Sequence, residues 1–169
     1  FSTIGAELNK AKFRELCTTF LFNSSLPIDL EYSKSSFNLD ADSGISEAQE
    51  TGIGQGKTMM SPLHNLLIAA TVANDGVMMK PTVVDRVQDA NGTVVQETEQ
   101  EEVVRAITAD EADTVTDYMR AVVMQGTGYA FKNSWYNAAG KTGSAQYDSS
   151  SNVHSWFTGF APYDNPQIA

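Results

Sequence analysis

Cysteine and histidine are scarce in this 169-residue chain, which contains one cysteine and two histidines. A single thiol, Cys17, cannot form a disulfide bond within the chain. Together with His64 and His154, it also falls short of the four nitrogen or sulfur ligands that a structural zinc site requires. The acidic residues show no spacing typical of metal ligands. The sequence therefore predicts no metal site, and nothing in it indicates a cofactor.

Basic residues are scarce as well. The chain has 11 lysines and arginines against 21 aspartates and glutamates, for a formal net charge of −10. Because nucleic acids and anionic membrane surfaces are bound by basic patches, this balance argues against both as partners. No apolar run approaches the roughly 18 residues that a membrane-spanning helix needs. No signal peptide is visible, and the chain opens at Phe1 rather than at an initiator methionine.

The composition is that of one soluble globular domain, with 41% hydrophobic and 19% charged residues. A chain of this length can bury roughly 68–70% of the surface that its unfolded form exposes, which is enough for a hydrophobic core. Apolar residues at helical spacing predict two short helices over 2–9 and 11–21. Residues 22–58 are expected to be mostly loop, and so long a loop is often functional. Ser61, followed by proline, is a good N-cap and predicts a helix over 62–75.

Valine-rich runs flank an Asn-Gly dipeptide and predict a hairpin over 81–97. The glutamates between Glu97 and Glu102 are expected to form a solvated loop, with a cation site as the less favoured alternative. A capping box, with threonine at 108 and glutamate at 111, predicts a helix over 109–124. The methionine pairs 59–60 and 78–79 are interpreted as core-filling residues.

Residues 138–147 and 155–161 are predicted to be two antiparallel strands, joined by a mobile, serine-rich tip at 149–151. The first strand carries the sequence AGKTGSAQ, which concentrates groups able to recognise an anion and a carbonyl. Lys141 supplies positive charge, and the hydroxyls of Thr142 and Ser144 can donate charge-assisted hydrogen bonds to a carboxylate.

The remaining residues of this strip suit the same purpose. Gly143 has no side chain, so a ligand can lie against the backbone there. The N–H of Ser144 can then face a developing oxyanion. The alternative interpretation is a lysine on a solvated strand or turn, and the eight residues alone leave both open.

Two other features have weaker functional interpretations. Residues 52–58 resemble a phosphate-binding loop, but that loop needs a glycine at position 51, where this chain has threonine. We interpret the segment as a glycine-rich turn, with nucleotide binding as the less favoured alternative. His64 is expected to be structural or solvated, and His154 has no evident partner for acid–base chemistry.

The KTG strip, followed by Ser-Ala-Gln, resembles the transpeptidase domain of penicillin-binding proteins. Residues 126–130 (GTGYA) and 154–162 (HSWFTGFAP) carry the resemblance upstream and downstream, and GQG at 54–56, leading to Ser61, adds to it. The ordered set covers about two-thirds of the chain and is most similar to the class B group. The resemblance implies an α+β fold related to the serine β-lactamases, in which helices pack on an antiparallel sheet.

The resemblance also implies an activity. In that family a serine in Ser-x-x-Lys attacks the penultimate D-alanine carbonyl of a cell-wall stem peptide, and an amine of a second stem peptide takes the acyl group. Lys141 and Ser144 become the catalytic candidates. Lys141 would contribute positive charge and assist proton transfer, and the N–H of Ser144 would be one half of the oxyanion hole. Thr142, Gly143 and Ser144 become the candidates that bind the carboxylate of the substrate or of a β-lactam. Strand alternation separates Lys141 from Thr142, so we expect this strand at the rim of a pocket, where its twist lets both reach in.

One part of the family pattern is not found in this chain. None of its seven lysines has a serine three residues before it, so no Ser-x-x-Lys occurs. Ser36-Phe37-Asn38 and 150–152 match the family's second motif, Ser-x-Asn, by letter, but both fall in predicted loops. We therefore expect residues 1–169 to be the C-terminal part of a transpeptidase domain, truncated at both ends and inactive alone.

Several expectations about partners follow from the resemblance. The ligands would be the D-Ala-D-Ala stem peptide and β-lactams, with no nucleic acid. The exposed apolar surface of an incomplete domain would bind the rest of the same domain or drive self-association. The location would be the extracytoplasmic face of a bacterial cell envelope, with the parent protein anchored in the cytoplasmic membrane. The alternatives are a D,D-carboxypeptidase or β-lactamase relative and a non-catalytic interaction module.

Overall fold

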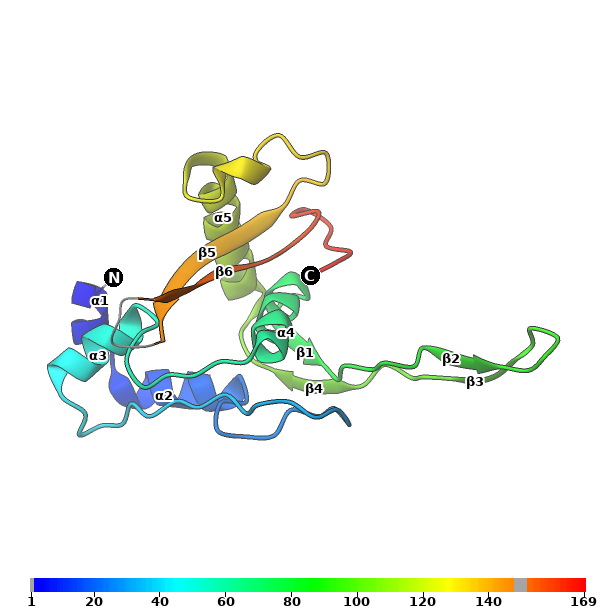
Figure 1. Cartoon of the computed structure of the whole chain (residues 1–169), viewed down its shortest axis with the longest axis horizontal. Coiled ribbons are helices and arrows are strands. Elements are labelled where there is room, and N and C mark those ends of the chain that lie inside the picture. The colour runs from blue at the N-terminus through cyan, green and yellow to red at the C-terminus, as the bar shows by residue number, and fades with distance from the viewer. Residues whose placement is uncertain (1, 148–151) are drawn as a thin grey trace.

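The computed structural model of the chain describes residues 2–147 and 152–169 (Figure 1). Within these residues, four helices are followed by four strands, and then by helix α5, a 3₁₀ turn and two more strands. The described strands form three separate antiparallel pairs, β1 with β4, β2 with β3, and β5 with β6. The elements are α1 (Ser2–Glu7), α2 (Lys10–Thr19), α3 (Ile45–Gly52), α4 (Pro62–Ala73), β1 (Val77–Met79), β2 (Arg86–Gln88), β3 (Val94–Glu97), β4 (Glu102–Arg105), α5 (Ala109–Gln125), the 3₁₀ turn η1 (Tyr129–Phe131), β5 (Ala139–Gln146) and β6 (Val153–Phe160).

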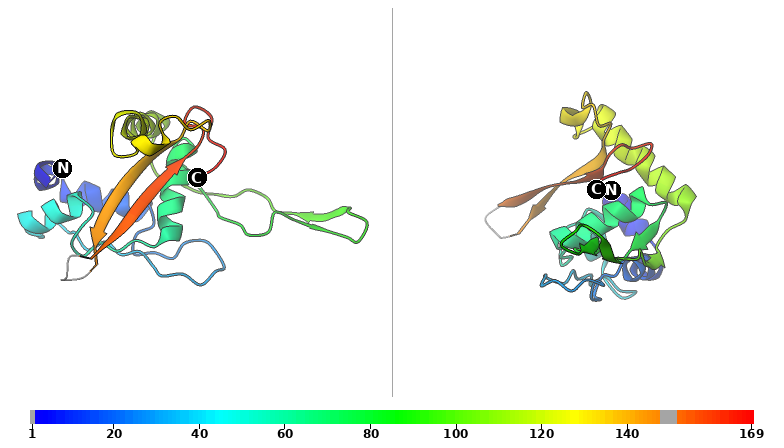
Figure 2. Two further views of the ribbon diagram at one scale, coloured as in Figure 1. Left: turned by 45° about the horizontal axis from the view of Figure 1, so that its top comes forward. Right: turned by 90° about the vertical axis from the view of Figure 1, so that its right-hand side faces the viewer.

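One hydrophobic core lies where the β5–β6 ribbon meets α4 and α5. Helix α5 packs along β5 and α4 packs against β6, as two views of the ribbon show (Figure 2). Val72 of α4, Met119 of α5, Ala139 and Phe160 form its buried cluster. The helices thus hold the ribbon by one end, and β5 leaves the core as it runs toward residue 146.

A second core holds the N-terminal part together. Cys17, Phe37, Leu39 and Ala48 are buried in it. Burial raises the pKa of the Cys17 thiol to about 11, because the thiolate loses its hydration. This cysteine is therefore a packing residue rather than a reactive thiol.

Helices α1 and α2 occur where the sequence predicts them, with Asn9 accepting a 3.1 Å hydrogen bond from the N–H of Lys12 as the N-cap of α2. Residues 22–58 are expected to be mostly loop, and the helix at 45–52, α3, is the part that this expectation did not identify. This helix has no side-chain N-cap, and Ala48 is its only buried residue. It packs closely on α1, since a Cβ on Gly5 would lie 2.8 Å from the carbonyl oxygen of Ala48. Tertiary contact, which local patterns do not report, stabilises α3.

Helix α4 begins as predicted, with Ser61 Oγ accepting a 3.3 Å hydrogen bond from the N–H of His64. His64 is structural: it is buried, and its Nε2 lies 2.6 Å from the carbonyl oxygen of Phe20. Burial lowers its pKa, although the contact with Phe20 acts in the opposite direction. The capping box of α5 is also present, with Thr108 and Glu111 bonded to each other's backbone N–H.

The predicted hairpin over 81–97 forms as the β2–β3 pair, turning through Gly92 at φ +84°. The expected loop after it is shorter than predicted, because Glu102 begins β4 and pairs with Met79. The core-filling interpretation is right for Met78, which is buried, but wrong for Met59, whose exposed fraction is 64%. The residue type alone does not distinguish a buried methionine from an exposed one.

Candidate active site

The segment AGKTGSAQ forms strand β5, and all eight of its residues pair in register with β6. The predicted hairpin is thereby confirmed, while its expected mobile tip at 149–151 lies outside the described residues. The first two residues of β5 are buried and the third, Lys141, is exposed. The candidate residues 141–144 therefore lie on the part of the strand that has just left the core.

Thr142 is half-buried, and its hydroxyl is hydrogen bonded to the hydroxyl of Thr127. Thr127 lies in the turn that ends α5. The N–H groups of Gly126 and Gly128 both donate to the carbonyl of Val122, at 3.0 and 3.1 Å, and close this turn. The end of α5 therefore holds a hydroxyl beside β5 and orients the side chain of Thr142.

A second segment reaches β5 from the N-terminal half of the chain. Nε2 of Gln55 donates a 3.1 Å hydrogen bond to the carbonyl oxygen of Ser144. Gln55 stands between Gly54 and Gly56, which both have φ of +75°, a conformation that glycine adopts without strain. These glycines let the chain turn sharply after α3 and point the glutamine at the strand.

This turn does not have the setting of a phosphate-binding loop. Such a loop follows a buried strand, whereas helix α3 precedes residues 53–58. The lysine of the segment, Lys57, forms an exposed ion pair with Glu47 at 3.2 Å. That contact lowers the pKa of the Glu47 carboxyl, mainly through the hydrogen bond from Lys57 and with help from Ser43. The glycine-rich turn therefore positions Gln55 against β5 rather than binding a phosphate.

Lys141 and Gln55 lie along the same edge of β5. The ammonium of Lys141 donates to the carbonyl of Thr142, two residues before the carbonyl of Ser144 that Gln55 contacts. Backbone carbonyls two residues apart in a strand point to the same edge, and β6 occupies the opposite edge. The N–H of Ser144 points the same way as its carbonyl. The ammonium of Lys141 and the N–H of Ser144 are thereby brought to the same edge of β5. The Lys141 side chain reaches this edge by bending along the strand, although Lys141 and Thr142 start on opposite faces of it.

The backbone at Gly143 is open on one side. A Cβ built there would meet Trp156 Cβ at 3.5 Å, an ordinary contact, and no closer atom of any described residue. Gly140 differs, since a Cβ there would lie 2.3 Å from the ring of Phe157 and 2.9 Å from the carbonyl oxygen of Thr158. Only the first of these two glycines leaves room for a ligand.

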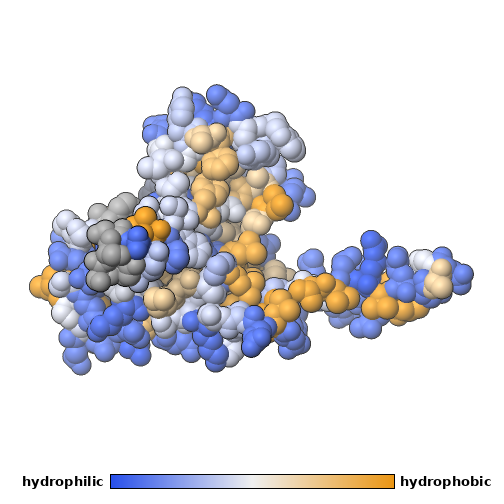
Figure 3. Space-filling view, viewed as in Figure 1, coloured by the Kyte–Doolittle hydropathy of each residue, from blue (hydrophilic) through white to orange (hydrophobic). Residues whose placement is uncertain are grey.

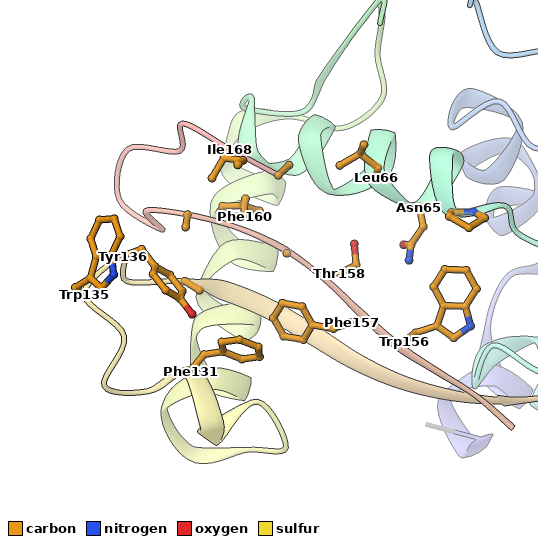
Figure 4. Close-up of a pocket in the computed structure, with 15 residues that line it drawn as sticks. Asn65, Leu66, Phe131, Trp135, Tyr136, Trp156, Phe157, Thr158, Phe160 and Ile168 are labelled. Carbon is orange, nitrogen blue, oxygen red and sulfur yellow. The ribbon is translucent and has the colours of Figure 1, made fainter. Parts of the chain in front are cut away.

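An apolar groove of about 600 Å³ lies between α4, β6 and the segment around η1 (Figure 4). Lys141 does not line it. The view shows Leu66 of α4 on one side and Phe131 and Tyr136 on another, with Phe157 pointing between them. We call this the apolar groove, lined by Pro62, Asn65, Leu66, Phe131, Trp135, Tyr136, Ala138, Ala169 and residues 156–161 and 168. It is a packing surface rather than a polar binding site, because nearly all of its lining is apolar or aromatic.

The histidines add nothing to this site. His154 is exposed at the far end of β6 and stacks on Tyr147, with ring centroids 4.2 Å apart. Within residues 2–147 and 152–169, no group of three or more histidine, cysteine or acidic side chains is arranged to hold a metal ion. The polar groups on the edge of β5 are therefore the candidate site.

The comparison with family models decides the family. The model of the penicillin-binding protein transpeptidase domain matches residues 1–169, the whole chain. The chain belongs to this family. The resemblance seen in the sequence and the α+β fold class are thus confirmed, and relatives of known structure show the same fold over nearly all of this transpeptidase-family chain.

Curated relatives of this transpeptidase-family chain are enzymes of peptidoglycan or penicillin-binding proteins by name. The peptidoglycan D,D-transpeptidase PbpA of Mycolicibacterium smegmatis is 33% identical over 122 residues, which is 70% of this chain and 25% of the relative. Penicillin-binding protein 3 of Bacillus subtilis is 28% identical, over 99% of this chain and 25% of its own length. The chain thus spans about a quarter of the length of these relatives.

Two solved structures superpose closely. The D,D-transpeptidase domain of a peptidoglycan glycosyltransferase from Eggerthella lenta has a TM-score of 0.83 at 27% identity, covering 98% of this chain and 44% of that one. The penicillin G acyl-enzyme complex of penicillin-binding protein A from Mycobacterium tuberculosis has a TM-score of 0.84 at 25% identity, covering 99% and 38%. The second relative therefore forms a covalent complex with a β-lactam.

Two residues of the site were not singled out from the sequence, although the motifs containing them were noticed. Gln55 and Thr127 each stand as a polar residue between two glycines, and each contacts β5. Glycines on both sides let a backbone turn bring one side chain close to a neighbouring strand. That shared pattern is the signal that could have identified both residues.

Proposed function

We propose that this chain is part of a D,D-transpeptidase that cross-links peptidoglycan stem peptides and is acylated by β-lactams. The observation that carries the proposal is the edge of β5, where the Lys141 ammonium and the Ser144 N–H lie together beside the hydroxyl of Thr142. Membership of the transpeptidase family supports the reaction class. The chain covers about a quarter of its curated relatives, so the activity belongs to a longer protein.

Each group on this edge has a role in the proposal. The hydroxyls of Thr142 and Ser144 bind the terminal carboxylate of the donor peptide or the carboxylate of a β-lactam. Lys141 adds positive charge next to that carboxylate and assists proton transfer. The N–H of Ser144 donates to the oxyanion that forms when the carbonyl is attacked. Gly143, with open space beside it, lets the ligand lie along the strand.

The chemistry needs a nucleophile from outside these 169 residues. A serine oxygen attacks the penultimate D-alanine carbonyl, the terminal D-alanine leaves as the amine, and an acyl ester forms. The amine of a second stem peptide then attacks the ester and releases the serine. Because the chain contains no Ser-x-x-Lys, residues 1–169 alone form no acyl-enzyme in this proposal.

A fluorescent penicillin tests both parts of the proposal. The longer protein from the same reading frame is expected to retain the label through denaturing electrophoresis, whereas the 169-residue chain is not. Hydrolysis of a D-Ala-D-Ala peptide without transfer to an added amine would instead indicate a carboxypeptidase. A longer protein without Ser-x-x-Lys that takes no label would favour the non-catalytic interaction module.

The apolar groove is where the proposal places the rest of the domain. Leu66, Phe157, Trp135 and Ile168 on its walls are all more than 40% exposed, and exposed apolar surface of this extent marks an interface. A part of the parent domain that lies outside this chain would cover it. In isolation the chain would self-associate through the same surface, and light scattering that shows a stable monomer at high concentration would contradict this.

The proposed location is the extracytoplasmic face of a bacterial envelope, with the parent anchored in the cytoplasmic membrane. Peptidoglycan, the substrate named for the relatives, supports this placement. None of the helices in the described ranges has the length and apolar character to cross a lipid bilayer. Fractionation of cells that express the longer protein, followed by protease treatment of spheroplasts, tests the placement.

A further inference from the structure

The β2–β3 hairpin projects far from the rest of the molecule (Figure 1). We call residues 81–101 the arm. The seven residues of β2 and β3 are all exposed, so neither face of this two-stranded ribbon is covered by any other described residue. A two-stranded hairpin with no covered face is marginally stable in water. An arm of this form is therefore unusual unless something binds it.

Hydrogen bonds nevertheless define the arm along its length. Oδ1 of Asp89 accepts from the N–H groups of Asn91 and Thr93, at 2.8 and 2.9 Å, and closes the turn at the tip. Closer to the body, the N–H of Thr98 donates to the carbonyl of Asp85 at 2.8 Å. At the base, Lys80 is paired with Glu101 at 2.8 Å. The arm is thus an ordered ribbon with two unpaired outer edges rather than a loose loop.

The side chains on the arm are apolar where a solvated hairpin would be polar. Five valines lie on it, with exposed fractions between 43% and 71%: Val83, Val84, Val87, Val94 and Val95. The space-filling view shows hydrophobic residues gathered along one side of the arm, with hydrophilic residues along the other (Figure 3). Valine is a strand-forming residue, and exposed apolar strands with free edges are sites for pairing with another strand.

The charge of the arm limits what can bind. It carries five carboxylates against one guanidinium, that of Arg86, which is paired with Asp85 at 3.6 Å. Glu97 and Glu99 make no salt bridge with any residue in the described ranges. A second acidic arm, an anionic lipid surface and a nucleic acid are all repelled by this charge. Opposite charge favours a basic partner.

We propose that the arm is a docking site for an extended, basic segment of another protein, in which apolar residues alternate with lysine or arginine. The segment adds a strand to a free edge of the ribbon, and its main-chain groups satisfy the unpaired N–H and C=O groups of that edge. Its apolar side chains cover the valines, and its cations face Glu97 and Glu99. The proposal goes beyond the transpeptidase function and does not depend on the site at β5.

The test uses the 169-residue chain and a fluorescently labelled nine-residue peptide that alternates lysine with valine. Anisotropy is expected to show saturable binding that weakens as salt is raised, because exposed ion pairs are screened. The same peptide with glutamate in place of lysine is not expected to bind. Hydrogen exchange at the amides of residues 94–97 is expected to slow on addition of the lysine peptide, as strand addition requires.

Matched variants locate the binding. The double variant Val87→Ser, Val94→Ser is expected to bind the peptide about tenfold more weakly, because apolar contact is lost. Charge reversal in Glu97→Lys, Glu99→Lys is expected to weaken binding and to flatten its salt dependence. The control is Val153→Ser, a valine of similar exposure (47%) on β6. Circular dichroism confirms that each variant folds.

Three results would overturn the proposal. One is equal binding of the lysine and glutamate peptides. Another is unchanged affinity in both arm variants, which would place the peptide elsewhere, such as in the apolar groove. The third is a dimer seen in sedimentation that the arm variants abolish, since the occupant would then be a second copy of this chain.

Discussion

The hydroxyl of Thr142 on β5 is hydrogen bonded to the hydroxyl of Thr127, in the turn that ends α5. This contact joins the end of α5 to Thr142, the residue proposed to bind a carboxylate. The position of α5 is set by its packing on β5. Thr127 is therefore a positioning residue in our proposal. It holds the rotamer of Thr142 without itself contacting the ligand.

Thr127→Val in the longer protein is expected to slow acylation by a fluorescent penicillin up to about tenfold, the equivalent of one hydrogen bond. Thr127→Ser keeps the hydroxyl and is expected to restore the rate. The measurement is the second-order rate constant of acylation. Equal rates for the valine and serine variants would show that the hydroxyl pair does not orient Thr142.

Lys141→Ala in the longer protein is expected to lower the acylation rate by about 100-fold or more, because a preorganised charge beside the reacting group is removed. Lys57→Ala provides the matched control. Lys57 is exposed and, among the described residues, pairs only with Glu47, so its loss should change the rate by no more than about twofold. Equal losses in the two variants would place the site of acylation away from the edge of β5.

Gly143 in the site and Gly159 on β6 have different expected roles, the first in ligand access and the second in packing. A Cβ at Gly159 would lie 2.3 Å from the carbonyl oxygen of Ala139, so Gly159→Ala is expected to destabilise the fold by about 2–3 kcal/mol. Gly143→Ala should cost less than about 1 kcal/mol, because its nearest contact is an ordinary 3.5 Å. Urea unfolding of the 169-residue chain measures both.

Gly143→Ala has a second expected effect. In the longer protein it should slow acylation although stability is nearly unchanged, since the added methyl group fills the space proposed for the ligand. Wild-type acylation in this variant would show that the ligand does not lie against Gly143.

His64 makes stability depend on pH. Burial lowers its pKa in the folded chain, so below the ordinary histidine pKa of about 6.5 the unfolded chain binds a proton that the folded chain does not. Stability is therefore complete above that pH and falls as pH decreases, by up to about 1 kcal/mol at pH 6. Urea unfolding between pH 8 and 6, where carboxylates stay ionised, measures the change.

His64→Gln is expected to remove most of this pH dependence, at the cost of some stability at every pH. His154→Gln, which removes an exposed histidine instead of a buried one, is the control variant. A wild-type profile that is flat between pH 8 and 6 would contradict the buried, neutral state of His64.

Where local signals were strong, the sequence predicted the structure well. The N-caps at Ser61 and Thr108 are side-chain hydrogen bonds to N–H groups three residues away, so a short window contains all the information. The glycine-bearing segment of β5 and its serine-rich connection to β6 were likewise local signals. Helix α3 was missed because it packs against α1, whose Gly5 precedes the start of α3 by forty residues.

The candidate site divides in the same way. Residues 141–144 and their family were read from the order of a few motifs, because residue type and spacing along one strand are properties of the sequence. That Gln55 and Thr127 meet this strand was decided only by the tertiary structure, which joins segments 89 and 15 residues apart. The exposed arm belongs to the second class as well: its hairpin turn is local, but whether its valines are covered depends on how the whole chain packs.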